Sequence, residues 1–367
     1  MAGPLAGMKV VEFTGLGAAP FVAMMLGDMG ADVVRIDRPG AAGPYPGLGT
    51  RADLIARSRR SIALDLKAPA DVATARDLVA RAEVLIEGFR PGVMERLGLG
   101  PAECQARNPR LTYARITGWG QTGPLAQTAG HDLNYLALTG LLPSFGRPGG
   151  PPPPPLNLIG DFGGGGLLGA FGILCAVLQT RQSGRGQVVD CAMLDGAALM
   201  GTMVYSLHAI GHWAATRGRN WVDGGAPFYD SYECADGKCI AIAPIEPAFY
   251  RILLDRAGID DPALQDPSDI DQWPDLKQRL ARLFRTRTRA DWCVLLEHTD
   301  ACVSPVLGPS EAPHHPHNSA RRVFVEHSGA LQPAPAPRFD GATPDLALPP
   351  PYPDEHRAEI LADWLMR

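Results

Sequence analysis

Two short runs, residues 8–13 (MKVVEF) and residues 31–37 (ADVVRID), decide the fold. Both are rich in β-branched residues, and an apolar helical pattern from residue 21 to residue 29 lies between them. A strand, a helix and a second strand at this spacing form a βαβ unit, whose two strands run parallel in one sheet. The sequence therefore predicts an α/β protein built on a parallel sheet.

The alternation of strands and helices continues along the chain. Apolar runs predict strands at residues 61–64, 83–87 and 111–117, and helical patterns cover residues 68–82 and parts of 91–108. These segments extend the parallel sheet predicted from the first unit.

Proline content and a change of pattern divide the rest of the chain. Prolines 151–155 predict an extended spacer, and a run with few charges predicts a long helix from residue 190 to about residue 213. Residues 228–306 carry a hairpin, three helical patterns and a strand, and a last helix is expected at 355–365. The predicted organisation is a large α/β domain starting with residues 1–189, a helical linker at 190–224, a small α+β domain at 225–310, and a return at 311–367 that completes the large domain.

Composition narrows the class of protein. The 367 residues include 34 lysines and arginines against 39 acidic residues, a net charge of −5, and no dense basic run, so neither nucleic acid nor a membrane is an expected partner. Seven scattered cysteines are typical of a reducing compartment, and a cytoplasmic protein is predicted. The longest apolar run, near residues 167–178, is expected to be too short to cross a bilayer.

Residues 14–20 (TGLGAAP) imitate the dinucleotide-binding fingerprint, with Asp37 at the end of the second strand. Pro20, however, stands where the third glycine belongs, and Arg38 directly follows Asp37. An arginine at that place suits a phosphate better than a free ribose hydroxyl. The pattern therefore disfavours a redox dinucleotide.

Four cationic residues follow predicted strands: Arg38, Lys67, Arg90 and Arg96. In an open parallel sheet, ligands bind beyond the carboxyl ends of the strands. Arginine binds phosphate through two parallel hydrogen bonds, so this group predicts a phosphate-bearing ligand at that edge.

Two glycine-flanked segments carry candidate proton-transfer residues. Residues 130–135 (GHDLNY) contain His131, and histidine is a residue type that can give or take a proton as a general acid or base. Residues 160–166 (GDFGGGG) place Asp161 at the mouth of a predicted glycine-rich loop that leads into an apolar helix. A carbon acid that loses and regains a proton needs two such carriers with backbone N–H groups nearby.

Several motifs together resemble the family III CoA-transferase superfamily. They lie at residues 4–12, 30–37, 58–67, 87–92, 183–190 and 355–361, nearly end to end. Within that superfamily, residues 130–135, 160–165 and 245–250 (IEPAFY) are similar to the α-methylacyl-CoA racemase branch. The transferase branches use the aspartate that matches Asp132 as an acyl-accepting nucleophile and typically lack a histidine at the place of His131.

The resemblance implies a large Rossmann-like domain and a small domain, joined by two linkers, in an interlocked homodimer with active sites at the interface. Coenzyme A would enter as part of an acyl-CoA thioester substrate, with no metal and no separate cofactor. The CoA-binding residues it implies are Arg38, Leu64, Asp65, Leu66, Lys67, Gly88, Phe89, Arg90, Arg96, Gly130, Asn134 and Tyr135.

The implied activity is inversion at C2 of a 2-methyl-branched acyl-CoA. The resemblance assigns His131 to one face of the substrate and Asp161 to the other, with Glu246 of the partner subunit orienting His131. The alternative is CoA transfer between carboxylic acids through an anhydride on Asp132. A CoA-binding protein without activity is the third interpretation.

Met193, Met200 and Met203 share one face of the predicted 190–213 helix, either as core residues or as a wall for the acyl chain.

Overall fold

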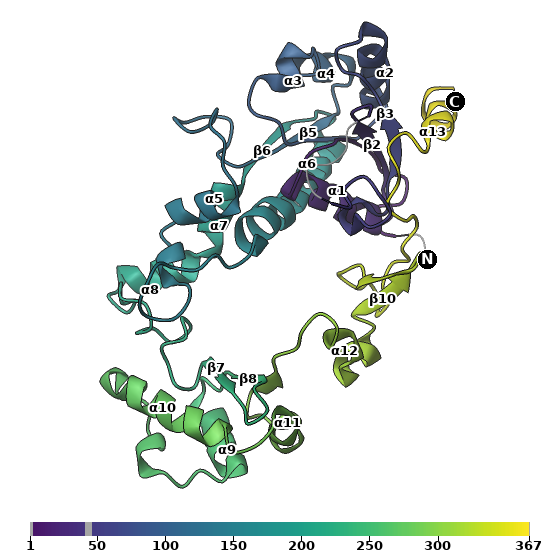
Figure 1. Cartoon of the computed structure of the whole chain (residues 1–367). Coiled ribbons are helices and arrows are strands. Elements are labelled where there is room, and N and C mark those ends of the chain that lie inside the picture. Colours follow the sequence, from purple (N-terminus) through teal and green to yellow (C-terminus); the bar gives the residue numbers. More distant parts are fainter. Residues whose placement is uncertain (1–2, 41–45, 367) are drawn as a thin grey trace. The chain divides into compact units, whose positions relative to one another are not determined.

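The computed structural model describes residues 3–40 and 46–366. The chain divides into two compact units, drawn in Figure 1. Unit 1 comprises Met1–Thr139, Leu156–Gly201 and His317–Arg367, and unit 2 comprises Gly140–Pro155 and Thr202–Pro316.

A six-stranded parallel sheet organises unit 1, in the order β3-β2-β1-β4-β5-β6. Its strands are β1 (Lys9–Phe13), β2 (Asp32–Asp37), β3 (Arg60–Ala63), β4 (Val84–Glu87), β5 (Thr112–Thr117) and β6 (Val188–Ala192). Val11 of β1 pairs with Val34 on one side and with Leu85 on the other, so the strand order reverses between β1 and β4. Such a reversal opens a crevice beyond the carboxyl ends of the strands. The α/β fold predicted from the sequence is confirmed.

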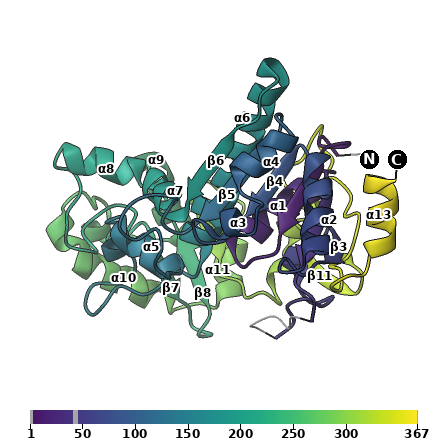
Figure 2. The ribbon, with the colours of Figure 1, turned by 90° about the horizontal axis from the view of Figure 1, so that it is seen from above.

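Helices cover both faces of this sheet (Figure 2). One face buries Val10 and Val33 against α1 (Ala18–Asp28) and α6 (Leu168–Ser183). The other buries Val11 and Val34 against α2 (Pro69–Ala80), α4 (Pro101–Arg107) and α13 (Arg357–Leu365). Successive residues of each strand point to opposite faces, which explains the nearly unbroken apolar runs in the sequence.

The glycine-rich segment is not a loop. Residues Leu158–Leu167 form a π-helix, η3, that continues directly into α6, so the predicted loop at residues 160–166 is wrong. A Cβ added at Gly164 would lie 2.7 Å from the backbone nitrogen of Ala197, and one at Gly165 would lie 2.7 Å from the Cβ of Ala18. The glycines therefore allow η3 to pack closely on α1 and on α7 (Met193–Met200).

The continuous helix Leu158–Ser183 is 26 residues long, and by length and composition it is the one helix within the described residues that is able to span a membrane. The apolar run is thus longer than predicted, because η3 extends α6 at its amino-terminal end. Its glycine face packs inside unit 1, as in the core helix of a folded domain.

The long helix predicted from residue 190 to about residue 213 is also wrong. Tyr113 of β5 pairs with Val188, so the chain up to Ala192 is extended as strand β6. Two short helices follow, α7 and α8 (Thr202–Ala209), with Gly201 between them. Met193 is buried, whereas Met200 and Met203 are exposed.

Unit 2 combines a small antiparallel sheet with helices. Its antiparallel sheet has the order β7-β8-β9, with β7 (Asp230–Glu233), β8 (Cys239–Ile242) and β9 (Val303–Pro305). Trp273, Phe284 and Trp292 are buried in its core. Three helices supply that core: α9 (Pro247–Ala257), α10 (Trp273–Phe284) and α11 (Arg289–Leu296).

The remaining elements are short. In unit 1 they include α3 (Val93–Arg96), α5 (Asp132–Leu138), η1 (Leu54–Ala56) and a hairpin of β10 (Phe324–His327) with β11 (Ala330–Pro333). The others are η2 (Leu142–Ser144), η4 (Pro262–Leu264), η5 (Ile270–Gln272), η6 (Ala312–His314) and α12 (Pro316–Arg321).

Candidate active site

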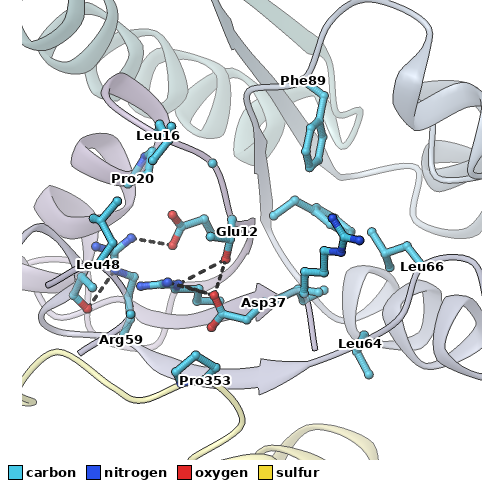
Figure 3. Close-up of a pocket in the computed structure, with 18 of the residues that line it drawn as sticks. Glu12, Leu16, Pro20, Asp37, Leu48, Arg59, Leu64, Leu66, Phe89 and Pro353 are labelled. Atoms are coloured by element: carbon cyan, nitrogen blue, oxygen red, sulfur yellow. Dashed lines mark hydrogen bonds and ion pairs between the residues drawn. The ribbon is translucent and has the colours of Figure 1, made fainter. Parts of the chain in front are cut away.

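A cavity of about 600 Å³ lies beyond the carboxyl ends of β1, β2 and β3 (Figure 3). This is the edge of the sheet at which the sequence predicted a ligand. Its apolar walls include Leu16, Pro20, Leu48 and Phe89. The volume falls within the range of pockets that hold cofactor-sized ligands.

A buried ion pair forms the floor of this cavity. The Nη1 atom of Arg59 lies 2.6 Å from the Oε2 atom of Glu12, and the two side chains are 0% and 1% exposed. Burial raises the pKa of Glu12, while the Arg59 guanidinium opposes that shift. The Oε1 atom of Glu12 and the Nη2 atom of Arg59 have no partner among the described residues. This pair was not predicted from the sequence, in which Glu12 stands near the end of an apolar strand.

Asp37 has no free carboxylate oxygen for a ribose. Its Oδ1 atom accepts hydrogen bonds from Thr14 at 3.0 Å and from Arg35 at 2.9 Å, and its Oδ2 atom accepts one from Ser61 at 2.6 Å. These contacts support the sequence argument against a dinucleotide site.

The rim of the cavity carries unpaired cations. Arg38 and Lys67 line the cavity, are exposed, and have no ion-pair partner among the described residues. Leu64, Asp65, Leu66 and Phe89 from the predicted CoA-binding group also line it. Within the described ranges, Arg90 and Arg96 are likewise exposed and unpaired, but they and Gly88 lie outside its lining.

Glu87 anchors the turn that follows β4. Its Oε2 atom accepts the backbone N–H of Phe89 at 2.7 Å, and its Oε1 atom lies 3.4 Å from Arg115. Burial raises the pKa of Glu87 to about 7, against the opposing hydrogen bond from Phe89 and the charge of Arg115. This carboxyl group was also missed in the sequence, where it reads as the end of an apolar strand.

His131 stands at the start of α5, and its neighbours fix that turn. The backbone N–H of His131 donates to the Oδ1 atom of Asn134 at 3.0 Å. Tyr135 is buried, donates its hydroxyl hydrogen to the carbonyl of Gly130, and packs edge-on against Trp119 at 4.8 Å between ring centroids. Burial raises the pKa of Tyr135 to about 12. Gly130, Asn134 and Tyr135, predicted to bind CoA, thus have local roles that hold an exposed His131 in place.

Asp161 lies beside this turn. Its backbone N–H donates to the Oδ1 atom of Asp132 at 2.7 Å, and its Oδ2 atom accepts a hydrogen bond from Asn157 at 3.1 Å. Burial raises the pKa of Asp161, the hydrogen bond from Asn157 lowers it, the charge of Asp132 raises it further, and His131 opposes that increase. The structure therefore brings His131, Asp132 and Asp161 within electrostatic range of one another.

Gly17 connects this group to the cavity. It lines the cavity, and a Cβ added to it would lie 3.1 Å from the Oδ2 atom of Asp161. His131, Asp132 and Asp161 are not among the residues that line the cavity, but Gly17, which does line it, lies next to the Asp161 carboxyl group.

Glu246 belongs to unit 2. It is exposed and directly precedes α9. Its expected contact with His131 therefore stays a prediction.

Comparison with known proteins supplies the family. The sequence model of CoA-transferase family III matches residues 5–357. The chain belongs to this family. It is 44% identical to the alpha-methylacyl-CoA racemase of Homo sapiens, over 98% of this chain and 93% of the relative. It is 31% identical to an acetyl-CoA:oxalate CoA-transferase of Acetobacter aceti, over 92% of this chain and 90% of that protein.

A solved family structure has the same architecture. A CAIB/BAIF family protein from Brucella suis superposes with a TM-score of 0.85 at 26% sequence identity, covering 99% of this chain and 100% of that one. Family membership and the racemase relationship confirm the resemblance drawn from the motifs.

Proposed function

We propose that this enzyme is a racemase that inverts C2 of 2-methyl-branched acyl-CoA thioesters. The observation that carries the proposal is that Gly17, which lines a cavity with cations at its rim, lies next to Asp161, whose carboxyl group is within electrostatic range of His131. The higher identity to a racemase than to a transferase supports the same conclusion.

The reaction is a proton transfer through an enolate. One base removes the C2 proton, and the electron pair of that C–H bond delocalises into the thioester carbonyl. The acid on the opposite face then protonates C2, which inverts its configuration. We assign His131 and Asp161 to the two faces; the raised pKa of Asp161 makes its carboxylate a stronger base than an ordinary aspartate. No electron is gained or lost, so the reaction requires no redox cofactor.

Backbone groups for the enolate oxygen come from α5. The N–H groups of Asp132 and Leu133, in its first turn, have no acceptor among the described residues. Free N–H groups at the start of a helix stabilise negative charge. The η3 glycines pack closely against the neighbouring helices α1 and α7.

The complete site is proposed to form in an interlocked homodimer, with Glu246 of the partner subunit orienting His131. On α6 and the η3 residue before it, Leu167, Phe171 and Leu178 form an apolar stripe and are 58%, 64% and 60% exposed, which supports association of two chains. Light scattering should give a dimer. Co-expressed chains carrying His131→Ala and Glu246→Ala, each inactive alone, should regain activity in mixed dimers if the two residues come from different subunits.

The transferase alternative requires Asp132 to attack an acyl group. Asp132 is only 5% exposed, and its Oδ1 atom accepts the N–H of Asp161. A nucleophile needs access to the substrate, so this arrangement favours the racemase. Hydroxylamine should capture an Asp132 acyl adduct in a transferase and nothing in a racemase.

Deuterium exchange tests the main proposal. In D₂O, the purified enzyme should introduce deuterium at C2 of 2-methylacyl-CoA esters without any acceptor acid. Binding of CoA without exchange, across several acyl chains, would instead support a binding protein. The cytoplasmic location remains a prediction from the cysteine content.

A further inference from the structure

Asp132 lies beside the two proposed bases, and the proposed reaction gives its side chain no task. It begins α5, is buried, and contacts the start of η3, 29 residues further along the chain. Gly160 makes this approach possible, because a Cβ added there would lie 2.7 Å from the Oδ1 atom of Asp132.

The amino-terminal end of η3 explains why a carboxylate is needed there. In a π-helix, each N–H bonds to the carbonyl five residues earlier, so the first N–H groups have no acceptor within the helix. Asp161 is the fourth residue of η3, and Asp132 accepts its N–H at 2.7 Å. A negative charge at a helix amino terminus is also favourable. Asp132 thus acts as a helix cap contributed by a distant segment.

The second oxygen of Asp132 remains available for an electrostatic role. The Oδ2 atom is buried and has no partner among the described residues. The charged and titratable groups interacting with the Asp161 carboxyl are Asp132, His131 and Tyr135, all from the segment around α5. Asn157 donates to this carboxyl from the residue preceding η3, and the backbone of Gly17 faces it from the turn after β1.

We propose that Asp132 is a positioning residue that acts through Asp161: one oxygen anchors the backbone of that base, and the negative charge of Asp132 lies close enough to act on its carboxyl group. This inference rests on the proposed racemase function and gives Asp132 a role other than that of a nucleophile.

Two substitutions in the full chain separate anchoring from charge. Asp132→Asn keeps an oxygen able to accept the Asp161 N–H but removes the charge, whereas Asp132→Ala removes both. Hydrogen–deuterium exchange mass spectrometry of the segment around Asp161 should show protection of its amide in the unaltered enzyme and in Asp132→Asn. The amide should exchange at least about tenfold faster in Asp132→Ala, because a hydrogen-bonded amide exchanges only when it opens.

The activity readout is C2 deuterium uptake, measured separately from each enantiomer. Asp132→Ala should reduce uptake through Asp161 by roughly 10–100-fold more than uptake through His131, since displacement of a base by about 1 Å has an effect of that size. In Asp132→Asn, half-maximal uptake through Asp161 should move to lower pH, because the neighbouring charge that raises its pKa is gone.

Equal loss from both enantiomers in Asp132→Ala, with unchanged protection of the Asp161 amide, would overturn the inference. A pH midpoint unchanged in Asp132→Asn would overturn its electrostatic part. Absence of C2 exchange in the unaltered enzyme would overturn the proposed function itself, and the amide measurement would then still decide whether Asp132 anchors Asp161.

Discussion

A Cβ atom on Gly17 would lie 3.1 Å from the Oδ2 atom of Asp161, so a side chain at the entrance to α1 would press on the proposed base. Gly17 also has a φ angle of +68°, a conformation that residues with a Cβ rarely adopt. Gly17 lines the cavity and also lies next to Asp161, so a substitution there should affect the proposed base as well as the cavity.

Gly17→Ala should lower turnover more than stability alone explains. The backbone strain should cost about 1–3 kcal/mol in the free energy of unfolding. Displacement of Asp161 should lower kcat in addition. Gly329→Ala is the matched control, since Gly329 has a φ of +78° but no neighbour within 4 Å of an added Cβ. Comparable losses of kcat in the two folded variants would contradict a special role for Gly17.

The two proposed bases should be separable by enantiomer. By analogy with the racemase branch, His131 is expected to face the 2S proton and Asp161 the 2R proton. His131→Ala should keep deuterium uptake from 2R substrate, and Asp161→Asn should keep it from 2S substrate. Both variants should lose epimerisation by roughly 10²–10⁴-fold. Mass spectrometry of each enantiomer in D₂O measures this, and equal loss from both enantiomers in both variants would indicate a single coupled base.

The cations at the rim should affect binding more than turnover. Arg38→Ala should raise KM with little change in kcat, because contacts remote from the reacting carbon stabilise ground state and transition state alike. The expected cost is about 1.5–3 kcal/mol per charged hydrogen bond. Arg96→Ala tests whether that residue, outside the cavity lining, also contributes. Arg185→Ala is the control, because Arg185 is exposed and does not line the cavity. If the KM of all three variants equals that of the unaltered enzyme, Arg38 and Arg96 do not belong to the binding site.

Glu87 should make stability depend on pH. Its folded-state pKa of about 7 exceeds the ordinary value of 4.5, so the folded state retains a proton that the unfolded state has lost between these values. The resulting penalty is absent below pH 4.5, grows as the pH rises, and is complete above about pH 7. Glu87→Gln removes this penalty. The free energy of unfolding of the variant minus that of the unaltered enzyme should therefore be larger at pH 8 than at pH 4.5, by up to about 3 kcal/mol.

Urea unfolding at several pH values measures that difference. Glu95→Gln is the control. Despite partial burial, the hydrogen bond from Arg115 lowers the pKa of Glu95. The free energy of unfolding of this variant, relative to the unaltered enzyme, should therefore fall rather than rise with increasing pH. A pH-independent difference between Glu87→Gln and the unaltered enzyme would contradict the assignment.

The glycines of η3 should matter for packing. Gly164→Ala places a methyl group against the backbone of α7, 2.7 Å from the nitrogen of Ala197, and should destabilise the protein by about 1–3 kcal/mol. Gly172→Ala, in α6, brings a methyl group no closer than 3.2 Å to a Val189 side-chain atom and should be tolerated. Thermal unfolding of both variants checks the expectation; equal transition temperatures would show that close packing at Gly164 is not required.

Sequence by itself determined most strands of the sheet and supplied the candidate residues of the proposed site. Residues 8–13 and 31–37 have the apolar, β-branched composition of buried parallel strands, and this local pattern specifies β1 and β2 directly. His131 and Asp161 became candidates because histidine and aspartate are residue types that serve as general acids and bases, and because motifs of the family surround them.

Tertiary structure alone decided what the polar and glycine residues do. The glycines at 163–166 are locally compatible with a loop, and only close packing against α1 and α7 makes them a helix. Residues 188–192 are extended because they form hydrogen bonds with β5, a pairing that the local sequence pattern does not predict. Likewise, Arg59 is a buried partner of Glu12 while Arg38 is free at the rim, although both are arginines near strand ends. A short segment encodes its own conformational preference, but the burial and partners of its side chains depend on residues far away in the chain.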